Sequence, residues 1–226
     1  MKKQGKYNGI FVAGLIISCW FSLLVYLLNL QVNYNNLIIY IFILLQTHLY
    51  TGLFITAHDA MHGVVSKNRK LNKIIGNIAA LLFAFNFYNK LIIKHHEHHR
   101  FVGSDKDPDY HEGPFFVWYF NFLKQYITWY QILLMAVTYN LLALVFPRGN
   151  LVLFWIVPSL LSTFQLFFFG TYLPHRGDHA PDNKHKSRSF QRNHFLAFIT
   201  CYFFGYHYEH HDSPSTPWWQ LYKAKR

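Results

Sequence analysis

Long apolar runs alternate with short polar stretches along the chain. Four of these runs approach the roughly 20 residues that a helix needs to cross a bilayer: residues 9–30, 37–57, 129–146 and 151–173. The last run contains Pro158, which a membrane helix tolerates where its neighbours satisfy the freed carbonyl. The pattern therefore predicts an all-α integral membrane protein with four transmembrane helices.

Two further segments are apolar but less suited to crossing. Residues 74–88 are too few to span comfortably, and they must return the chain to the side it left, so we expect a re-entrant or interfacial segment. Residues 115–130 mix aromatic and polar side chains, a pattern typical of an interfacial helix. The remaining polar regions, 58–128 and 174–226, would form a cap on one side of a single domain that covers residues 1–226.

The distribution of charge indicates which side that is. All of the 21 lysines and arginines except Arg148 fall on one side of the four spans. This positive-inside asymmetry places both termini, and the cap, in the cytosol. The net charge of +11 is not gathered into a basic cluster of the kind that binds nucleic acid. We therefore expect an integral protein of a bacterial cell membrane, or its equivalent, with no nucleic-acid partner.

Histidines recur in the predicted cap at helical spacing. Positions i, i+3 and i+4 share one face of a helix, and two sets of three have this spacing, while a further pair lies one turn apart. Neutral imidazoles on one face are ligands for iron, zinc or copper, and eight are too many for one zinc, which takes about four. The sequence therefore predicts two metal ions bound close together by His58, His62, His95, His98, His99, His207, His210 and His211.

Other polar residues near these boxes have candidate roles. His175 ends the fourth span at the depth where His58 ends the second, and we expect it to be a ninth ligand. Metal-bound imidazoles usually donate their other N–H to an acceptor, a role that suits Asp107 and Asp109, with His111 in the same loop as a further outer contact. His48 lies within the second span, where it either lines a substrate cavity or has a hydrogen-bonded structural role. No catalytic residue beyond the ligands is predicted.

Some residues have simpler interpretations. His96 points about 100° off the ligand face of its helix, so we expect no ligation by it. Trp218 and Trp219 are typical of interfacial anchors in an aromatic belt. Cys19 and Cys201 lie far apart in apolar stretches and are expected to be reduced core thiols.

These motifs resemble those of a known superfamily, the membrane-bound di-iron oxygenases and desaturases, which carry three histidine boxes on the cytosolic ends of transmembrane helices. Within it the chain looks like the bacterial-type β-carotene ketolases, from about residue 47 to residue 221. The mild departure is Tyr110, where that family usually has phenylalanine. The matching stretches are residues 58–63, 95–99, 107–111, 169–176, 204–211 and 217–221.

The resemblance implies a cofactor and a reaction. It implies two non-haem iron ions, O2 as co-substrate, and electrons from reduced ferredoxin or a similar carrier. It further implies a keto group introduced at C4 of the β-ionone ring of β-carotene, by two hydroxylations and a dehydration, giving echinenone and canthaxanthin in carotenoid biosynthesis. The carotenoid would enter from the bilayer, and the cationic cytosolic face, with Lys184, Lys186 and Arg188, could steer an acidic ferredoxin.

Several alternatives remain at this stage. A carotenoid ring hydroxylase acting at C3, or another membrane desaturase-like oxygenase, would have the same boxes. A metal transporter would place polar ligands at mid-membrane, where only His48 lies. A membrane zinc protease is disfavoured because the chain has no H-E-x-x-H motif.

Overall fold

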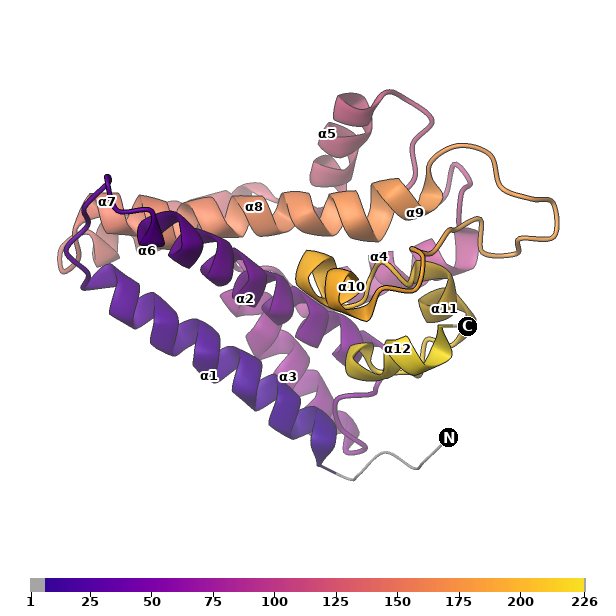
Figure 1. Cartoon of the computed structure of the whole chain (residues 1–226), viewed down its shortest axis with the longest axis horizontal. Coiled ribbons are helices and arrows are strands. Elements are labelled where there is room, and N and C mark those ends of the chain that lie inside the picture. Colours follow the sequence, from indigo (N-terminus) through magenta and orange to yellow (C-terminus); the bar gives the residue numbers. More distant parts are fainter. Residues whose placement is uncertain (1–6, 226) are drawn as a thin grey trace.

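The computed structural model describes residues 7–225, and within them every regular element is a helix. The all-α prediction is therefore confirmed for this part of the chain. Lys2, Lys3, Lys6 and Arg226, which contribute to the charge argument, lie outside the described residues. Figure 1 shows α1 and α2 running obliquely beneath one long, nearly straight helix, with the short C-terminal helices gathered near one end of that helix.

Three helices are long and apolar enough to cross a membrane: α1 (Asn8–Leu28), α2 (Ile38–Met61) and the long helix Arg148–His175. Large apolar side chains such as Phe11, Leu15 and Leu44 project outward from α1 and α2. A lipid environment solvates such faces, whereas water would not. The chain is therefore a membrane protein, and three of the four predicted spans coincide with these helices.

The long helix contains two π-helical segments. It is built from α7 (Arg148–Leu151), η1 (Val152–Ile156), α8 (Val157–Leu166), η2 (Phe167–Tyr172) and α9 (Leu173–His175). Pro158 stands in the first turn of α8, directly after η1, so the wider turn absorbs the hydrogen bond that proline cannot donate. The helix has 28 residues, which gives a length of about 42 Å and carries His175 to the far end from Arg148.

The remaining predicted span is shorter than expected. The helix α6 (Trp129–Leu142) has 14 residues, and residues 143–146 form turns before Pro147. Proline disfavours the α conformation in the residue before it, so the helix could not have continued through Phe146, and it ends four residues before that, at Leu142. At about 21 Å, α6 is too short to cross a bilayer unaided, so the fourth span remains a prediction.

Three short helices occupy the predicted interfacial segments. They are α3 (Arg69–Leu82), α4 (Tyr88–Phe101) and α5 (Phe115–Tyr126), none of them long enough to span. Asn68 caps α3 by accepting hydrogen bonds from the N–H groups of Lys70 and Leu71. The helix then packs along the second half of α2 and leads the chain back to α4, which carries the second histidine box.

The C-terminal segment folds back onto α2. It comprises α10 (His194–Cys201), α11 (His207–Asp212), the 3-10 turn η3 (Trp218–Gln220) and α12 (Leu221–Ala224). Trp218 is only 9% exposed, lies against the ring of Tyr202, and donates its backbone N–H to Asp59 of α2 at 3.1 Å. The interpretation of Trp218 as an interfacial anchor is therefore wrong, because this side chain packs inside the protein and fixes the C-terminal segment.

Polar contacts also define the end of the bundle away from the histidines. The side-chain amide of Asn150 donates to the carbonyl oxygens of Leu27 and Leu30, at 2.9 and 2.8 Å. The α1–α2 turn and the start of the long helix thus lie together. Figure 1 places α7 and α9 at opposite ends of the long helix, so the solitary cation Arg148 is at the end opposite His175.

Candidate metal centre

Nine histidines form two adjacent groups at the ends of the helices. Within each group the nearest ring nitrogens all lie within 4.8 Å of one another. The structure thus brings together every histidine that the sequence marks as a candidate ligand, including His175. The first group is His58, His62, His95, His99 and His210, and the second is His98, His175, His207 and His211.

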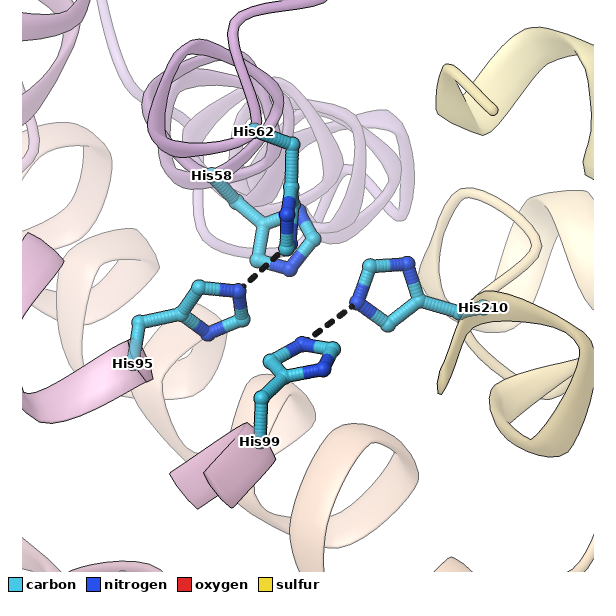
Figure 2. A group of neighbouring side chains, drawn as sticks. All are labelled: His58, His62, His95, His99 and His210. Atoms are coloured by element: carbon cyan, nitrogen blue, oxygen red, sulfur yellow. Dashed lines mark hydrogen bonds between the residues drawn. The ribbon is translucent and has the colours of Figure 1, made fainter. Parts of the chain in front are cut away.

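The first group joins three helices around one space. Figure 2 shows His58 and His62 from the end of α2, His95 and His99 from α4, and His210 from α11, with their rings directed toward a common centre. The Nε2 atoms of His62 and His95 are 2.6 Å apart, and those of His99 and His210 are 3.1 Å apart. Spacing of four residues on α2 and on α4 places two rings from each helix on this centre.

The second group is deeper and entirely buried. The Nε2 atom of His211 lies 2.9 Å from Nε2 of His207 and 3.1 Å from Nε2 of His98. His175 joins them from the end of the long helix, with its ring centroid 4.8 Å from that of His207. Its Nδ1–H donates to the carbonyl of Lys186 at 2.8 Å, which leaves Nε2 directed away from that bond.

The geometry of both groups fits a metal ion. With metal–nitrogen bonds of about 2.1 Å, ligands at right angles are about 3 Å apart, which matches the spacing of these nitrogens. Nε2 of His175 is buried and has no hydrogen-bond partner among the described residues. A buried ring nitrogen without a partner is costly, and a metal ion in the second group would satisfy it.

The electrostatics of the histidines outside the spanning helices favour the same interpretation. Burial lowers the pKa of His62 to about 4 and that of His99 to about 2, and it holds the pKa values of His95, His207 and His210 well below the ordinary range. Their rings are therefore neutral near pH 7. Neutral imidazole is the form that binds metal, so these five ligands need no deprotonation before loading. His98 is the exception, because the carboxylates of Asp109 and Asp107 outweigh the effect of burial and raise its pKa.

Asp107 orients His98 from outside the group. Its Oδ1 accepts the Nδ1–H of His98 at 2.9 Å, and the N–H groups of Gly103 and Asp109 also donate to its carboxylate. Although burial raises the pKa of Asp107, the hydrogen bond from His98 and the backbone bonds lower it further, so the carboxyl is ionised. An ionised acceptor at Nδ1 leaves Nε2 of His98 free to face the other histidines.

Asp109 and His111, the two other outer candidates, lie in different surroundings. Asp109 is 3.9 Å from Nδ1 of His98 and accepts a hydrogen bond from the hydroxyl of Tyr126. Burial raises the pKa of Asp109 to about 6. The ring of His111 accepts a hydrogen bond from the N–H of Gly113, and within residues 7–225 no contact joins it to either histidine group.

Two supporting groups were not predicted from the sequence. One is the carbonyl of Lys186, which orients His175. Because this acceptor belongs to the backbone and is 11 residues away, the residue types in the sequence do not indicate it. The other is Asp59, which is buried beside His58 and accepts the N–H of Trp218. Its position inside the first box, between two histidines, was a signal that could have identified it.

An apolar cavity of about 320 Å³ touches both groups of histidines. His58 and His95 of the first group and His98 and His207 of the second line it, and most of the remaining wall is aliphatic or aromatic. Such a cavity is suited to an apolar molecule, part of which would lie beside both groups. Further lining residues include Phe54, Phe83, Leu91, Phe122, Met135, Leu160, Leu166 and Phe204.

His48 is not among the residues that line this cavity. Its ring stacks on Tyr202 with centroids 4.2 Å apart and meets the edge of Phe198. Neither ring nitrogen has a hydrogen-bond partner in the described part of the chain. His48 therefore acts as an aromatic packing residue, and neither of the two roles expected for it is observed.

We expect His48→Phe to leave the metal bound per chain within about twofold of that of the unsubstituted protein. Replacing a polar side chain that has no partners by an apolar one of similar shape is nearly neutral or stabilising. The measurements are the metal content per chain and the thermal midpoint of the purified protein. A large loss of bound metal at unchanged stability would contradict the packing role and indicate that His48 contributes to the metal centre.

Comparison with known proteins assigns the chain to a family. The family of fatty acid desaturases matches residues 35–126 and 114–226, so the chain belongs to the fatty acid desaturase family. No solved structure matches it significantly.

Within that family the chain is similar to ketolases. It is 41% identical to the β-carotene ketolase of Paracoccus sp. (strain N81106 / MBIC 01143), over 95% of this chain and 90% of that protein. It is 44% identical to the β-carotene ketolase of Paracoccus sp. (strain PC1), over 80% and 76% of the two chains. It is also 40% identical to the zeaxanthin 4-ketolase of Chlamydomonas reinhardtii, over 97% of this chain and 53% of that protein.

Proposed function

We propose that this protein is a membrane carotenoid ketolase that converts C4 of a β-ionone ring to a ketone with O2. The observation that carries the proposal is the apolar cavity, which touches both histidine groups, in a chain 41% identical to a β-carotene ketolase over 95% of its length. A hydrocarbon substrate needs an apolar cavity wall around it. Its oxidation needs metal-binding histidines beside the carbon that reacts.

The nine histidines would hold two iron ions, one in each group, with Asp107 and Asp109 as outer contacts. When bound, the irons supply the activation of O2. The chain's own residues do the rest: Asp107 keeps His98 in one tautomer, and the carbonyl of Lys186 does the same for His175. The apolar wall excludes water from the reacting carbon and positions the ring.

The substrate chemistry accounts for oxidation at C4. This carbon is allylic to a long polyene, so its C–H bonds are weak. Each hydroxylation consumes one O2, two electrons and two protons, inserts one oxygen atom and releases one water. The second hydroxylation at the same carbon gives a gem-diol, which loses water to become the ketone.

A lateral entrance to the cavity supports delivery of the substrate from the bilayer. Ile132 of α6 and Leu160 of α8 both line the cavity, yet they are 62% and 61% exposed. The cavity therefore reaches the outer surface between these two helices, where lipid would surround the protein. An insoluble carotenoid can enter there without passing through water.

The same arrangement supports the four-span topology as a proposal for one domain over residues 1–226. Outward apolar side chains on α6, such as Trp129 and Leu141, are suited to lipid contact. With α6 as the fourth span, the histidine cap and both termini face the cytosol. Local thinning of the bilayer, or snorkelling of flanking residues, accommodates a helix of this length.

Electrons would come from a ferredoxin-like carrier that docks on the cationic cytosolic face. The exposed side chains of Lys184 and Lys186 are suited to this, although Lys184 also pairs with Asp212 at 2.8 Å and Lys186 donates one hydrogen bond to the carbonyl of Gly103 at 3.2 Å. Arg188 is a poorer choice for substitution, because it donates to the carbonyls of Arg176 and Asp178 and so shapes the loop after His175.

Neutralising Lys184 and Lys186 to glutamine should reduce the dependence of turnover on ionic strength, because fewer charges then steer the donor. The measurement is ketone formation in membranes with an acidic ferredoxin over a range of salt concentrations. Lys73→Gln, an exposed charge on α3, is the matched control. An unchanged salt dependence in the double variant would count against this docking face.

The function itself is tested by expression in bacteria that accumulate β-carotene, followed by chromatography with mass detection. Echinenone and canthaxanthin are expected from the unsubstituted chain and not from His210→Ala. Ring products with a hydroxyl at C3 would instead identify the hydroxylase alternative. Unchanged β-carotene, with the protein in the membrane and loaded with iron, would overturn the assignment.

A further inference from the structure

One hydroxyl on the cavity wall has no partner. Thr171 lies in the π-helical segment η2, lines the cavity beside Gly170, and is 4% exposed. Within residues 7–225 the side chain of Thr171 has no hydrogen-bond partner. A hydroxyl in an apolar wall is costly unless it is hydrogen-bonded, so the cavity is where this group would find a partner.

The other uncharged polar side chains on the wall are satisfied within the protein. Ser159 donates to the carbonyl of Ile156 at 2.8 Å, and Thr163 donates to that of Ser159 at 2.9 Å. The amides of Gln131 and Asn86 bond to each other at 2.8 Å. Thr171 is therefore the exception on this wall.

The π-helical turn explains the exception. Threonine in an α-helix commonly donates its hydroxyl to the carbonyl four residues earlier, as Thr47, Thr51 and Thr56 of α2 do. A π turn changes the register between a side chain and the carbonyls of the preceding turn, and Thr171 lacks this bond. Such turns are frequent at functional sites, and this one carries a threonine whose hydroxyl is not bonded and which lines the cavity beside the histidines.

The position of Thr171 relates it to the reacting end of the cavity. It precedes His175 by four residues, about one helical turn along the same long helix. His175 belongs to the second group, whose members His98 and His207 also line the cavity. The hydroxyl is thus one turn from the histidines, at the end where a ring would be oxidised.

The hydrocarbon ring offers this hydroxyl nothing to bind. After the first oxidation, however, the ring carries a hydroxyl at C4, and the ketone requires a second oxidation at that same carbon. We propose that Thr171 binds the 4-hydroxyl of the half-oxidised ring and retains it in the cavity until the second oxidation. This inference rests on the proposed ketolase function, and Thr171 is then a residue that decides between alcohol and ketone as the product.

The atoms and electrons of the second oxidation balance. The 4-hydroxy carbon loses its remaining hydrogen and gains a second hydroxyl, with O2 as oxidant and two electrons from the reduced carrier that the first oxidation also uses. One oxygen atom leaves as water in the oxidation, and the gem-diol then loses a second water. Thr171 forms only a hydrogen bond in this sequence and is neither oxidised nor consumed.

The test compares product ratios in three variants expressed in β-carotene-accumulating bacteria. Thr171→Val removes the hydroxyl at nearly constant shape and should raise the ratio of 4-hydroxy to 4-keto carotenoids by about tenfold, the effect of one hydrogen bond. Thr171→Ser should keep the original ratio. Thr163→Val, on the same wall but with its hydroxyl already bonded internally, should also keep it.

A second measurement separates retention from damage to the fold. Membranes supplied with 4-hydroxylated β-carotene should show a KM raised about tenfold in Thr171→Val and in Thr171→Ala, while the KM for β-carotene stays unchanged. An unchanged product ratio and KM in both variants, or an equal rise in Thr163→Val, would overturn the proposal. Absence of every C4-oxygenated product in the unsubstituted protein would instead contradict the ketolase function itself.

Discussion

His210→Ala should abolish ketone formation and lower bound iron by about one ion per chain, because a metal site that loses a ligand loses its geometry. His210 is the α11 residue of the first group, and Figure 2 shows its ring facing His99 across the centre. Bound metal supplies several kcal/mol of rate enhancement, so the rate should fall by at least about 10³-fold. Iron per chain and pigment yield are the two measurements.

A second variant and a control make this result specific. His207→Ala, in the other group, should also remove about one ion per chain and abolish the reaction. His96→Ala is the matched control, because His96 lies on α4 between two members of the first group but is exposed and belongs to neither group. Full iron content and activity in His210→Ala would contradict the two-ion assignment, as would equal losses in the control.

The division of the boxes follows from helix geometry. Successive residues turn by about 100°, so i+4 lies about 40° from i, whereas i+3 lies about 60° away on the other side. On α4, His95 and His99 accordingly join the first group and His98 joins the second. On α11, His207 and His211 share a group and His210 belongs to the other.

The i, i+3, i+4 spacing therefore predicts that the histidines meet, and it also predicts how they divide between two metal centres. Each box that has three histidines gives its i and i+4 members to one group and its i+3 member to the other. His58 and His62, which have only the i and i+4 positions, both fall in the first group. One spacing rule thus serves all three boxes, and the histidines were predictable because their chemistry and helical period coincide.

Other features depend on contacts between distant segments, which no local pattern encodes. The end of α6 at Leu142 and the packing of His48 against Tyr202 are examples. Tryptophan is a residue type common in interfacial anchors, but the backbone N–H of Trp218 donates to Asp59 and its side chain packs inside the protein. The free hydroxyl of Thr171 likewise depends on a π turn, which hydropathy does not reveal.

Asp107→Asn should weaken iron binding and ketone formation by about 10–100-fold, the usual effect of removing an outer contact of a metal-bound histidine. The carboxylate accepts hydrogen bonds from His98, Gly103 and Asp109, so both oxygens are occupied by donors. An asparagine has one oxygen and one NH2 group. In either orientation the NH2 group faces at least one N–H, and that buried donor loses its partner.

Asp105→Asn is the control for this prediction, because Asp105 lies in the same loop, two residues earlier, and is exposed. Iron retention against a chelator gives the affinity, and the thermal midpoint shows whether the loop still folds. A variant that folds, loses iron readily and regains activity at high iron concentration would place the defect in the orientation of His98. Unchanged iron affinity in Asp107→Asn would show that the second group holds its geometry without the carboxylate, and that the buried packing around His98 is sufficient to fix its ring.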